Sequence, residues 1–157
     1  MNDPFKKHPN SHITTVHLFL IKKINNKKNI LLLKRHNTGY EDGNYSVPAG
    51  HIEPGENAIQ AMIRETFEET KVKLNEKQLK FCHIVDRFDK KIPESRLDFF
   101  FKSNNWNGDP TNGEPSKCSQ LLWVEINNLP KKVIPYIKQA VECYEQNIKY
   151  SELGFKE

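Results

Sequence analysis

The sequence predicts an α/β fold in a single domain, and three observations lead to this prediction. The chain has 157 residues, a length that suits one compact domain. Segments typical of strands alternate along it with two segments of helical periodicity. No internal repeat or linker-like stretch divides the chain. Strands interleaved with helices predict a sheet that is covered on both faces.

Six segments are predicted to form strands because they are rich in aliphatic, β-branched and aromatic residues and end in polar or glycine-containing turns. These segments are Ile13–Ile24, Ile30–Lys34, Tyr45–Val47, Leu79–Phe88, Arg96–Lys102 and Leu121–Ile126. The segment Asn104–Ser116 is dense in Asn, Gly and Pro, which predicts a loop.

Two segments are predicted to be helices. The first runs from about Asn57 to Lys71 after a Pro-Gly pair, and the second, Val133–Asn147, follows Pro130. In the first helix, side chains at i, i+3 and i+4 spacing form a stripe that we predict to be buried. The stripe consists of Ile59, Met62, Ile63, Thr66, Phe67 and Thr70.

The composition is that of a globular protein, with 36% apolar and 28% charged residues. Residues 1–11 are polar and lack the apolar core of a signal peptide, so we expect a flexible arm before a domain over residues 12–157. Cys82, Cys118 and Cys143 lack metal-ligand spacing, which predicts reduced packing thiols and a cytoplasmic location.

The formal net charge of +4 is mild and suits an anionic ligand. No apolar run approaches the roughly 18 residues that span a bilayer, and no aromatic-rich basic stripe suggests nucleic acid. The pattern GxxxxGK[ST] is absent, which argues against a P-loop nucleotidase. We therefore expect neither a membrane nor a nucleic acid as partner.

Three glutamates of the first helix form a candidate cation site. At 100° per residue, Glu65, Glu68 and Glu69 fall within about 100° of one another on the side opposite the stripe. Like charges at this spacing cost roughly 0.2–0.5 kcal/mol per pair, and Arg64 is expected to point some 80° or more away. Several carboxylate oxygens suit Mg²⁺ or Mn²⁺. The alternative is a solvated acidic face.

Residues 50–72 resemble the motif of the Nudix hydrolase superfamily. That motif is Gly, five residues, Glu, seven residues, Arg-Glu, an aliphatic residue, any residue, Glu-Glu, any residue, Gly and an aliphatic residue. The positions that match are Gly50, Glu56, Arg64, Glu65, Glu68 and Glu69. Two positions depart: Thr66 replaces an aliphatic residue, and Lys71 replaces the glycine that ends the helix. We expect Thr66 to hydrogen bond back to the helix and Lys71 to adopt a left-handed conformation.

The resemblance extends beyond the motif, over most of residues 13–147. Upstream, residues 35–50 are similar to the strand and loop that lead into it. Downstream, Glu114–Cys118 and the following Trp123 are similar to a segment of MutT-like nucleoside triphosphate pyrophosphohydrolases.

The resemblance implies an α/β/α sandwich around a mixed sheet, and a metal site. Glu65, Glu68 and Glu69 would bind Mg²⁺, with Mn²⁺ as a substitute, helped by a backbone carbonyl near Ala49 or Gly50. Arg64 would orient a carboxylate, and Glu56, like Gly50, would have a structural role in the motif. The implied general base is Glu68 or Glu69, and Glu114 is a rival for that role.

Aromatic and basic residues near the motif are candidate substrate contacts. Arg35, Tyr40 and Tyr45 are predicted to bind substrate. For Tyr40, Tyr45, Phe100 and Trp106, however, core packing is the competing and simpler explanation.

The implied activity is hydrolysis of a nucleoside diphosphate-linked substrate, foremost a nucleoside triphosphate to the monophosphate and pyrophosphate. An ADP-ribose or nucleotide-sugar pyrophosphatase is the alternative enzyme. A non-catalytic nucleotide-binding module on the same fold is a third reading, although no glutamate of the motif is missing. Either a monomer or a homodimer fits these expectations.

Overall fold

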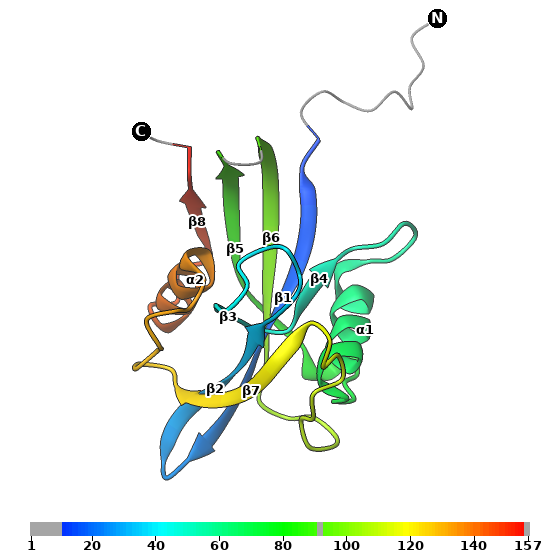
Figure 1. The fold of residues 1–157 in the computed structure, drawn as a ribbon, viewed down its shortest axis with the longest axis vertical. Coiled ribbons are helices and arrows are strands. Elements are labelled where there is room, and N and C mark those ends of the chain that lie inside the picture. The colour runs from blue at the N-terminus through cyan, green and yellow to red at the C-terminus, as the bar shows by residue number, and fades with distance from the viewer. Residues whose placement is uncertain (1–10, 91–92, 156–157) are drawn as a thin grey trace, which may run out of the picture.

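The chain forms a sheet with one long helix on each side (Figure 1). The computed structural model describes residues 11–90 and 93–155. The predicted N-terminal arm therefore lies outside the described residues except for Ser11. The two helices are α1 (Ala58–Thr70) and α2 (Pro135–Glu145), and a short 3₁₀ turn spans Glu76–Gln78. The strands are β1 (Ile13–Ile24), β2 (Lys27–Arg35), β3 (Tyr45–Ser46), β4 (Ala49–His51), β5 (Lys80–Asp89), β6 (Glu94–Ser103), β7 (Cys118–Glu125) and β8 (Tyr150–Leu153).

The sheet is mixed. Within the described residues its strand order is β3-β2-β1-β6-β5-β8, with β4 paired to β1 and β7 paired to β2. β1 runs parallel to β6 and antiparallel to both β2 and β4, and β8 runs parallel to β5. β1 therefore lies in the middle of the sheet, paired with β2, β4 and β6.

Two hydrophobic cores lie on opposite faces of the sheet, and β1 contributes to both. Phe19 and Ile21 point into the core with α2, whereas Leu18 and Leu20 point into the core with α1. Successive strand residues face opposite sides, so a strand covered on both faces is apolar at nearly every position. This explains the continuous burial from Thr15 to Ile21.

Both ends of α1 lie within one residue of the predicted bounds, Asn57 and Lys71. Asn57 caps the helix by accepting from the Gln60 N–H at 2.9 Å, and the Gln60 side chain accepts from the Asn57 N–H at 2.9 Å. At the other end Lys71 has a φ of 59°, in the left-handed region, and its N–H donates to the Phe67 carbonyl. The Thr66 hydroxyl donates to the Met62 carbonyl at 2.7 Å, as predicted.

The buried stripe of α1 is narrower than predicted. Phe67, which the spacing assigned to the buried face, is 43% exposed, and the Lys71 ammonium lies 5.4 Å from its ring centroid. The fully buried positions are Ala61, Met62, Thr66 and Thr70. The prediction for Phe67 was wrong because the face that α1 packs on β1 and β4 is turned toward Ala61, which leaves Phe67 at the solvent-exposed flank.

Two strands were not predicted. β4 has three residues, and β8 carries the polar residues Ser151 and Glu152 at the sheet edge. Neither has the apolar alternation by which strands are recognised. Among the described residues, the cysteines are free thiols, as predicted, and no helix is long and apolar enough to cross a membrane.

Candidate active site

A cavity of about 450 Å³ lies between α1, the central strands and the start of α2. Two groups of side chains are associated with this cavity. We call the first the glutamate wall, which consists of Glu65, Glu68, Glu69 and Glu114. We call the second the inner cluster, in which Thr15, His17, Arg87 and Tyr136 line the cavity and Asp98 lies behind them.

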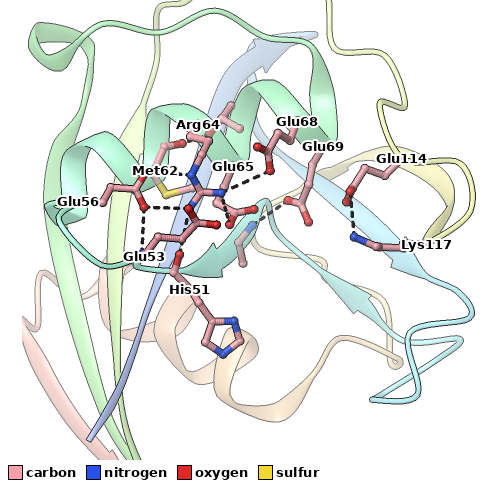
Figure 2. A network of polar contacts seen from close by, with 12 residues as sticks. His51, Glu53, Glu56, Met62, Arg64, Glu65, Glu68, Glu69, Glu114 and Lys117 are labelled. Carbon is pink, nitrogen blue, oxygen red and sulfur yellow. Dashed lines mark hydrogen bonds and ion pairs between the residues drawn. The ribbon is translucent and has the colours of Figure 1, made fainter.

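Arg64 joins the start of the motif to the glutamate wall (Figure 2). Its Nε and Nη2 donate to the two Glu56 carboxylate oxygens at 2.8 and 2.9 Å. Its Nη1 donates to Glu65 at 2.7 Å and lies 3.4 Å from Glu68. The expectation that Arg64 points away from the glutamates was therefore wrong. The wheel angle describes the Cβ direction, whereas a long arginine side chain reaches back across a helical turn.

Glu56 has its charge balanced by Arg64. The guanidinium and the Glu53 N–H, which donates at 3.1 Å, lower the pKa of Glu56 to about 2. Arg64 also donates to the His51 carbonyl at 3.1 Å, which ties α1 to the end of β4. The pair thus positions Arg64, and through it the Glu65 carboxylate.

Glu69 is the enclosed member of the glutamate wall. Its Oε2 accepts from the Ala49 N–H at 2.8 Å. Burial, followed by the negative charges of Glu65 and Glu114, raises the pKa of Glu69 to about 8. Burial also raises the pKa of Glu65, while the Glu68 side chain is 48% exposed. Three carboxylates in different surroundings therefore meet at one side of the cavity.

Gly50 is required by the position of Glu65. A Cβ on Gly50 would lie 2.0 Å from the Glu65 carboxyl carbon, so any side chain there would displace that carboxylate. Gly50 also pairs with Val16 in the β1–β4 ladder. The glycine therefore allows the strand backbone to lie directly against the glutamate wall.

Glu114 reaches the cavity because its loop caps the C-terminal end of α1. The N–H groups of Thr111 and Gly113 donate to the last-turn carbonyls of Thr70 and Glu69, each at 2.9 Å. Glu114 forms an ion pair with Lys117 at 3.0 Å, and Lys117 also lines the cavity (Figure 2). Lys117 was not predicted, although it lies three residues after Glu114 in the sequence.

The three predicted substrate contacts differ in position. Arg35 and Tyr40 line the cavity, and Arg35 also braces the intervening loop by donating to the Tyr40 carbonyl at 2.7 Å. Tyr45 is not among the residues that line the cavity: it packs against the core on the α2 side, and its hydroxyl donates to Gln120 at 3.2 Å. Phe100 is a core residue, and Trp106 stacks on Trp123.

The inner cluster was not predicted. Arg87 Nε donates to Asp98 at 2.8 Å, and the Thr15 hydroxyl donates to the same carboxylate at 2.6 Å. The Arg87 guanidinium lies 4.1 Å from the centroid of the Tyr136 ring. His17 Nε2 lies 3.2 Å from the Tyr136 hydroxyl. The available signal was the presence of His17, Arg87 and Asp98 within segments predicted to be buried strands.

The family model of the NUDIX domain matches residues 14–143, which include both groups of side chains. The chain belongs to the NUDIX family. Membership implies a pyrophosphohydrolase that acts on nucleoside diphosphate-linked substrates.

Solved structures agree with the Nudix fold and with the expected α/β/α sandwich. A MutT NUDIX hydrolase from Burkholderia pseudomallei has a TM-score of 0.74 at 23% identity, covering 84% of this chain and 97% of that one. The NUDIX domain of Shewanella oneidensis NrtR, complexed with ADP ribose, has a TM-score of 0.73 at 17% identity, with 94% of each chain covered. A C. elegans Ap4A hydrolase has a TM-score of 0.65 at 24% identity, with 85% and 96% covered.

The donor set of this Nudix site fits a hard divalent ion by its chemistry. Glu65, Glu68 and Glu69 offer only oxygen ligands toward one cavity, and burial and like charge raise the pKa of Glu69. Among the described residues, however, no group of three His, Cys, Asp or Glu side chains is arranged to hold a metal as it stands. The Arg64 guanidinium donates hydrogen bonds to Glu65 and Glu68, and the Ala49 N–H donates one to Glu69. Each of these contacts involves one oxygen of its carboxylate, and a carboxylate can accept further ligands through its second oxygen.

Proposed function

We propose that this Nudix protein is a Mg²⁺-dependent hydrolase that cleaves a phosphoanhydride bond. Its substrate would be a nucleoside triphosphate, converted to the monophosphate and pyrophosphate. The observation that carries the proposal is the intact set of Glu65, Glu68 and Glu69 on a cavity wall, braced by Arg64. Mn²⁺ would substitute for Mg²⁺, because both prefer oxygen ligands.

The residues of the glutamate wall would hold the ion and orient the attacking water. A bound Mg²⁺ supplies charge neutralisation at the phosphates and activates that water. Arg64 keeps Glu65 in place, which is a positioning role. Lys117 and Arg35, which also line the cavity, supply positive charge toward the phosphates. Catalysis by such a site depends on positioning and electrostatics more than on covalent chemistry.

Glu69 is our first candidate for the general base. It is enclosed and fixed by a main-chain hydrogen bond, whereas Glu68 is about half-exposed. Glu114 is the rival candidate because it lines the same cavity from a separate loop. A general base must lie within hydrogen-bond reach of the water that it activates, and both residues meet the cavity that would hold that water.

The alternative substrate class is ADP-ribose or a nucleotide sugar. This class is supported by the similar NUDIX domain of Shewanella oneidensis NrtR, which is complexed with ADP ribose. A cavity of about 450 Å³ is within the range for ligands of this size.

The test is a substrate panel with product identification. The purified chain is incubated with the nucleoside triphosphates, ADP-ribose, a nucleotide sugar and dinucleoside polyphosphates, each with Mg²⁺, Mn²⁺ or EDTA. We expect pyrophosphate and monophosphate from triphosphates, only when a divalent ion is present. Preferential release of AMP from ADP-ribose would support the alternative class. Binding of nucleotides without turnover of any substrate would indicate a non-catalytic module and overturn the proposal.

A further inference from the structure

The inner cluster contains groups that the proposed hydrolysis does not use. Asp98 is fully buried, and Arg87 and His17 are almost so, yet all are polar. They come from β1, β5 and β6, and Tyr136 joins them from α2. Replacing a buried ion pair with well-packed apolar residues often costs a protein little stability. A buried polar group beside a cavity is therefore a candidate for ligand recognition.

The inner cluster carries no net charge. The positive Arg87 is paired with Asp98, which also accepts from Thr15. Burial lowers the pKa of His17 to about 4, and burial raises the pKa of Tyr136. Both side chains are therefore neutral near pH 7. The cluster is thus suited to an uncharged polar group, whereas the phosphates are matched by the cations near the glutamate wall.

His17 has one ring nitrogen without a partner. Its Nε2 lies 3.2 Å from the Tyr136 hydroxyl, and its ring stacks on Phe100 with a centroid distance of 4.6 Å and an interplanar angle of 20°. Its Nδ1 is buried and forms no hydrogen bond with any described residue. Buried polar atoms are normally hydrogen bonded, so an unpaired one beside a cavity is a candidate for a hydrogen bond with a ligand.

We propose that His17 is a specificity residue whose Nδ1 forms a hydrogen bond with an uncharged edge of the substrate's nucleobase. This inference rests on the proposed function. Because Nδ1 is shielded in the free protein, contact requires the His17 ring to move toward the cavity that it already lines. In a neutral histidine one ring nitrogen donates and the other accepts, so Nδ1 has one of these roles at a time and favours the nucleobase edge that complements it.

The β1–β4 ladder places the two parts of the cavity within reach of one ligand. His17 pairs with Ala49, whose N–H binds Glu69, and Thr15 pairs with His51. A nucleotide with its phosphates at the glutamate wall would therefore extend its base toward the inner cluster. The Arg87 guanidinium and the Tyr136 ring add flat surfaces on which a planar base can rest.

Two substitutions separate the ring nitrogens of His17. In His17→Asn the terminal polar atoms lie near the position of Nδ1, and in His17→Gln they lie near that of Nε2. We measure kcat and KM for ATP, GTP, CTP and UTP and take the ratio of kcat/KM between best and worst. We expect His17→Gln to reduce this ratio about tenfold, mainly through KM, because the lost contact is remote from the reacting phosphate. We expect His17→Asn to retain most of it.

His83→Gln is the matched control. His83 is a buried histidine outside the residues that line the cavity, and both of its nitrogens have partners, the Ile148 carbonyl and the Ser151 hydroxyl. This variant should lose stability without changing the nucleotide ratio. A ratio in His17→Gln equal to that of the wild type, or a wild type without nucleotide preference, overturns the inference alone. A wild type that hydrolyses no phosphoanhydride overturns the proposed function and the inference with it.

A second measurement does not depend on variants that fold. The ¹⁵N chemical shifts of the histidine ring report tautomer and hydrogen bonding, and His17 is assigned in the wild-type protein. AMP, GMP, CMP and UMP are then added one at a time to saturation. We expect the favoured monophosphate to shift the Nδ1 signal of His17 while the His83 signals stay unchanged. Unchanged His17 signals with all four would contradict the proposed hydrogen bond.

Discussion

The glutamate wall and the inner cluster line one cavity but are built in different ways. Three of the four wall glutamates lie within five residues of α1, whereas the inner cluster gathers side chains from three strands and α2. Most of the wall is therefore encoded by a local pattern within one helix. The inner cluster forms only when distant parts of the chain come together in the folded protein.

The two groups also differ in charge balance. In the wall, Arg64 contacts only Glu65 and Glu68, and the pKa of Glu69 is raised to about 8 by burial and by like charge. In the inner cluster, Arg87 and Asp98 neutralise each other at 2.8 Å. This difference is consistent with our proposals that the glutamate wall binds a cation and that the inner cluster contacts an uncharged group of the substrate. Five predictions test this contrast, in order of decreasing effect.

Replacing the Glu69 carboxyl group with an amide should produce the largest effect on activity. We expect Glu69→Gln to lower kcat by about 10²–10⁴-fold, the range for loss of a general base. The amide oxygen of glutamine can still accept from the Ala49 N–H, so the melting temperature should stay close to that of the wild type. Glu53→Gln, an exposed glutamate at the same cavity, should retain nearly full activity. Equal rates in the two variants would remove Glu69 from the proposed mechanism.

Breaking the buried ion pair should produce the largest effect on stability. Asp98→Ala removes the carboxylate 2.8 Å from the buried Arg87 and leaves it, among the described residues, only Asp89, 4.0 Å away, as a carboxylate partner; we expect the free energy of unfolding to fall by about 3–5 kcal/mol. The double change Arg87→Met with Asp98→Leu should recover most of that loss. The exposed pair Lys138–Glu142, 3.9 Å apart, is the control, and Glu142→Ala should cost less than about 1 kcal/mol. Urea titration measures all of these, and a small effect of Asp98→Ala would show that Arg87 finds another partner.

Acidification should destabilise the protein through His17. Burial lowers its pKa from 6.5 to about 4 in the folded state, so the unfolded chain binds more protons between these values. Stability from this group is present above pH 6.5 and is lost as the pH falls toward 4, by about 3 kcal/mol. The free energy of unfolding of His17→Leu should therefore fall less over this interval than that of the wild type. If the free energy of unfolding of the two proteins falls equally with pH, a group other than His17 is responsible for the loss.

Replacing Arg64 should weaken the wall without removing a carboxylate. Arg64→Lys keeps the charge but cannot bind Glu56 through two nitrogens while also holding Glu65. We expect Mg²⁺ affinity or kcat/KM to fall about 10–100-fold, as for other residues that orient metal ligands. Arg96→Lys, at the same cavity but paired with Glu94, should change Mg²⁺ dependence little. Mg²⁺ titration of activity distinguishes the two.

A substitution at the C-terminal end of α1 should have the smallest effect, and it should increase stability. Lys71 has a φ of 59°, so Lys71→Gly should raise the free energy of unfolding by about 0.5–1 kcal/mol. Asn147 has a φ of 58° after α2, and Asn147→Gly should gain less, because asparagine tolerates this conformation. Activity should stay the same in both. A loss of stability in Lys71→Gly would mean that the contact of Lys71 with the Phe67 ring outweighs the backbone strain.

The sequence allowed the wall to be predicted because helices and their ends depend on near neighbours. The cap at Asn57, the left-handed Lys71 and the internal hydrogen bond of Thr66 all follow from residues within one or two turns. The direction of Arg64 was predicted wrongly because a wheel angle does not describe where a long side chain ends. Phe67 was predicted wrongly because the small Ala61, which the apolar spacing did not include, lies on the buried face and Phe67 lies at its edge.

The inner cluster could not be predicted because its contacts join distant parts of the chain. Thr15 and Asp98 are 83 residues apart, and His17 and Tyr136 are 119 residues apart. Each side chain by itself is an ordinary polar residue in a strand or helix. Tyr45 illustrates the converse: it lies close in sequence to Tyr40, but short strand β3 turns it to the core on the α2 side.

The parallel pairing of β1 with β6 has a consequence for how the protein folds. During synthesis, the first strand emerges well before the partner that it will lie beside, since Ile13 pairs with Arg96. Contacts between such distant segments form slowly. A hairpin of β1 with β2 can form early, but Thr15 and His17 acquire their neighbours only after most of the chain has left the ribosome. Ligand recognition would therefore be one of the last properties that a newly made molecule gains.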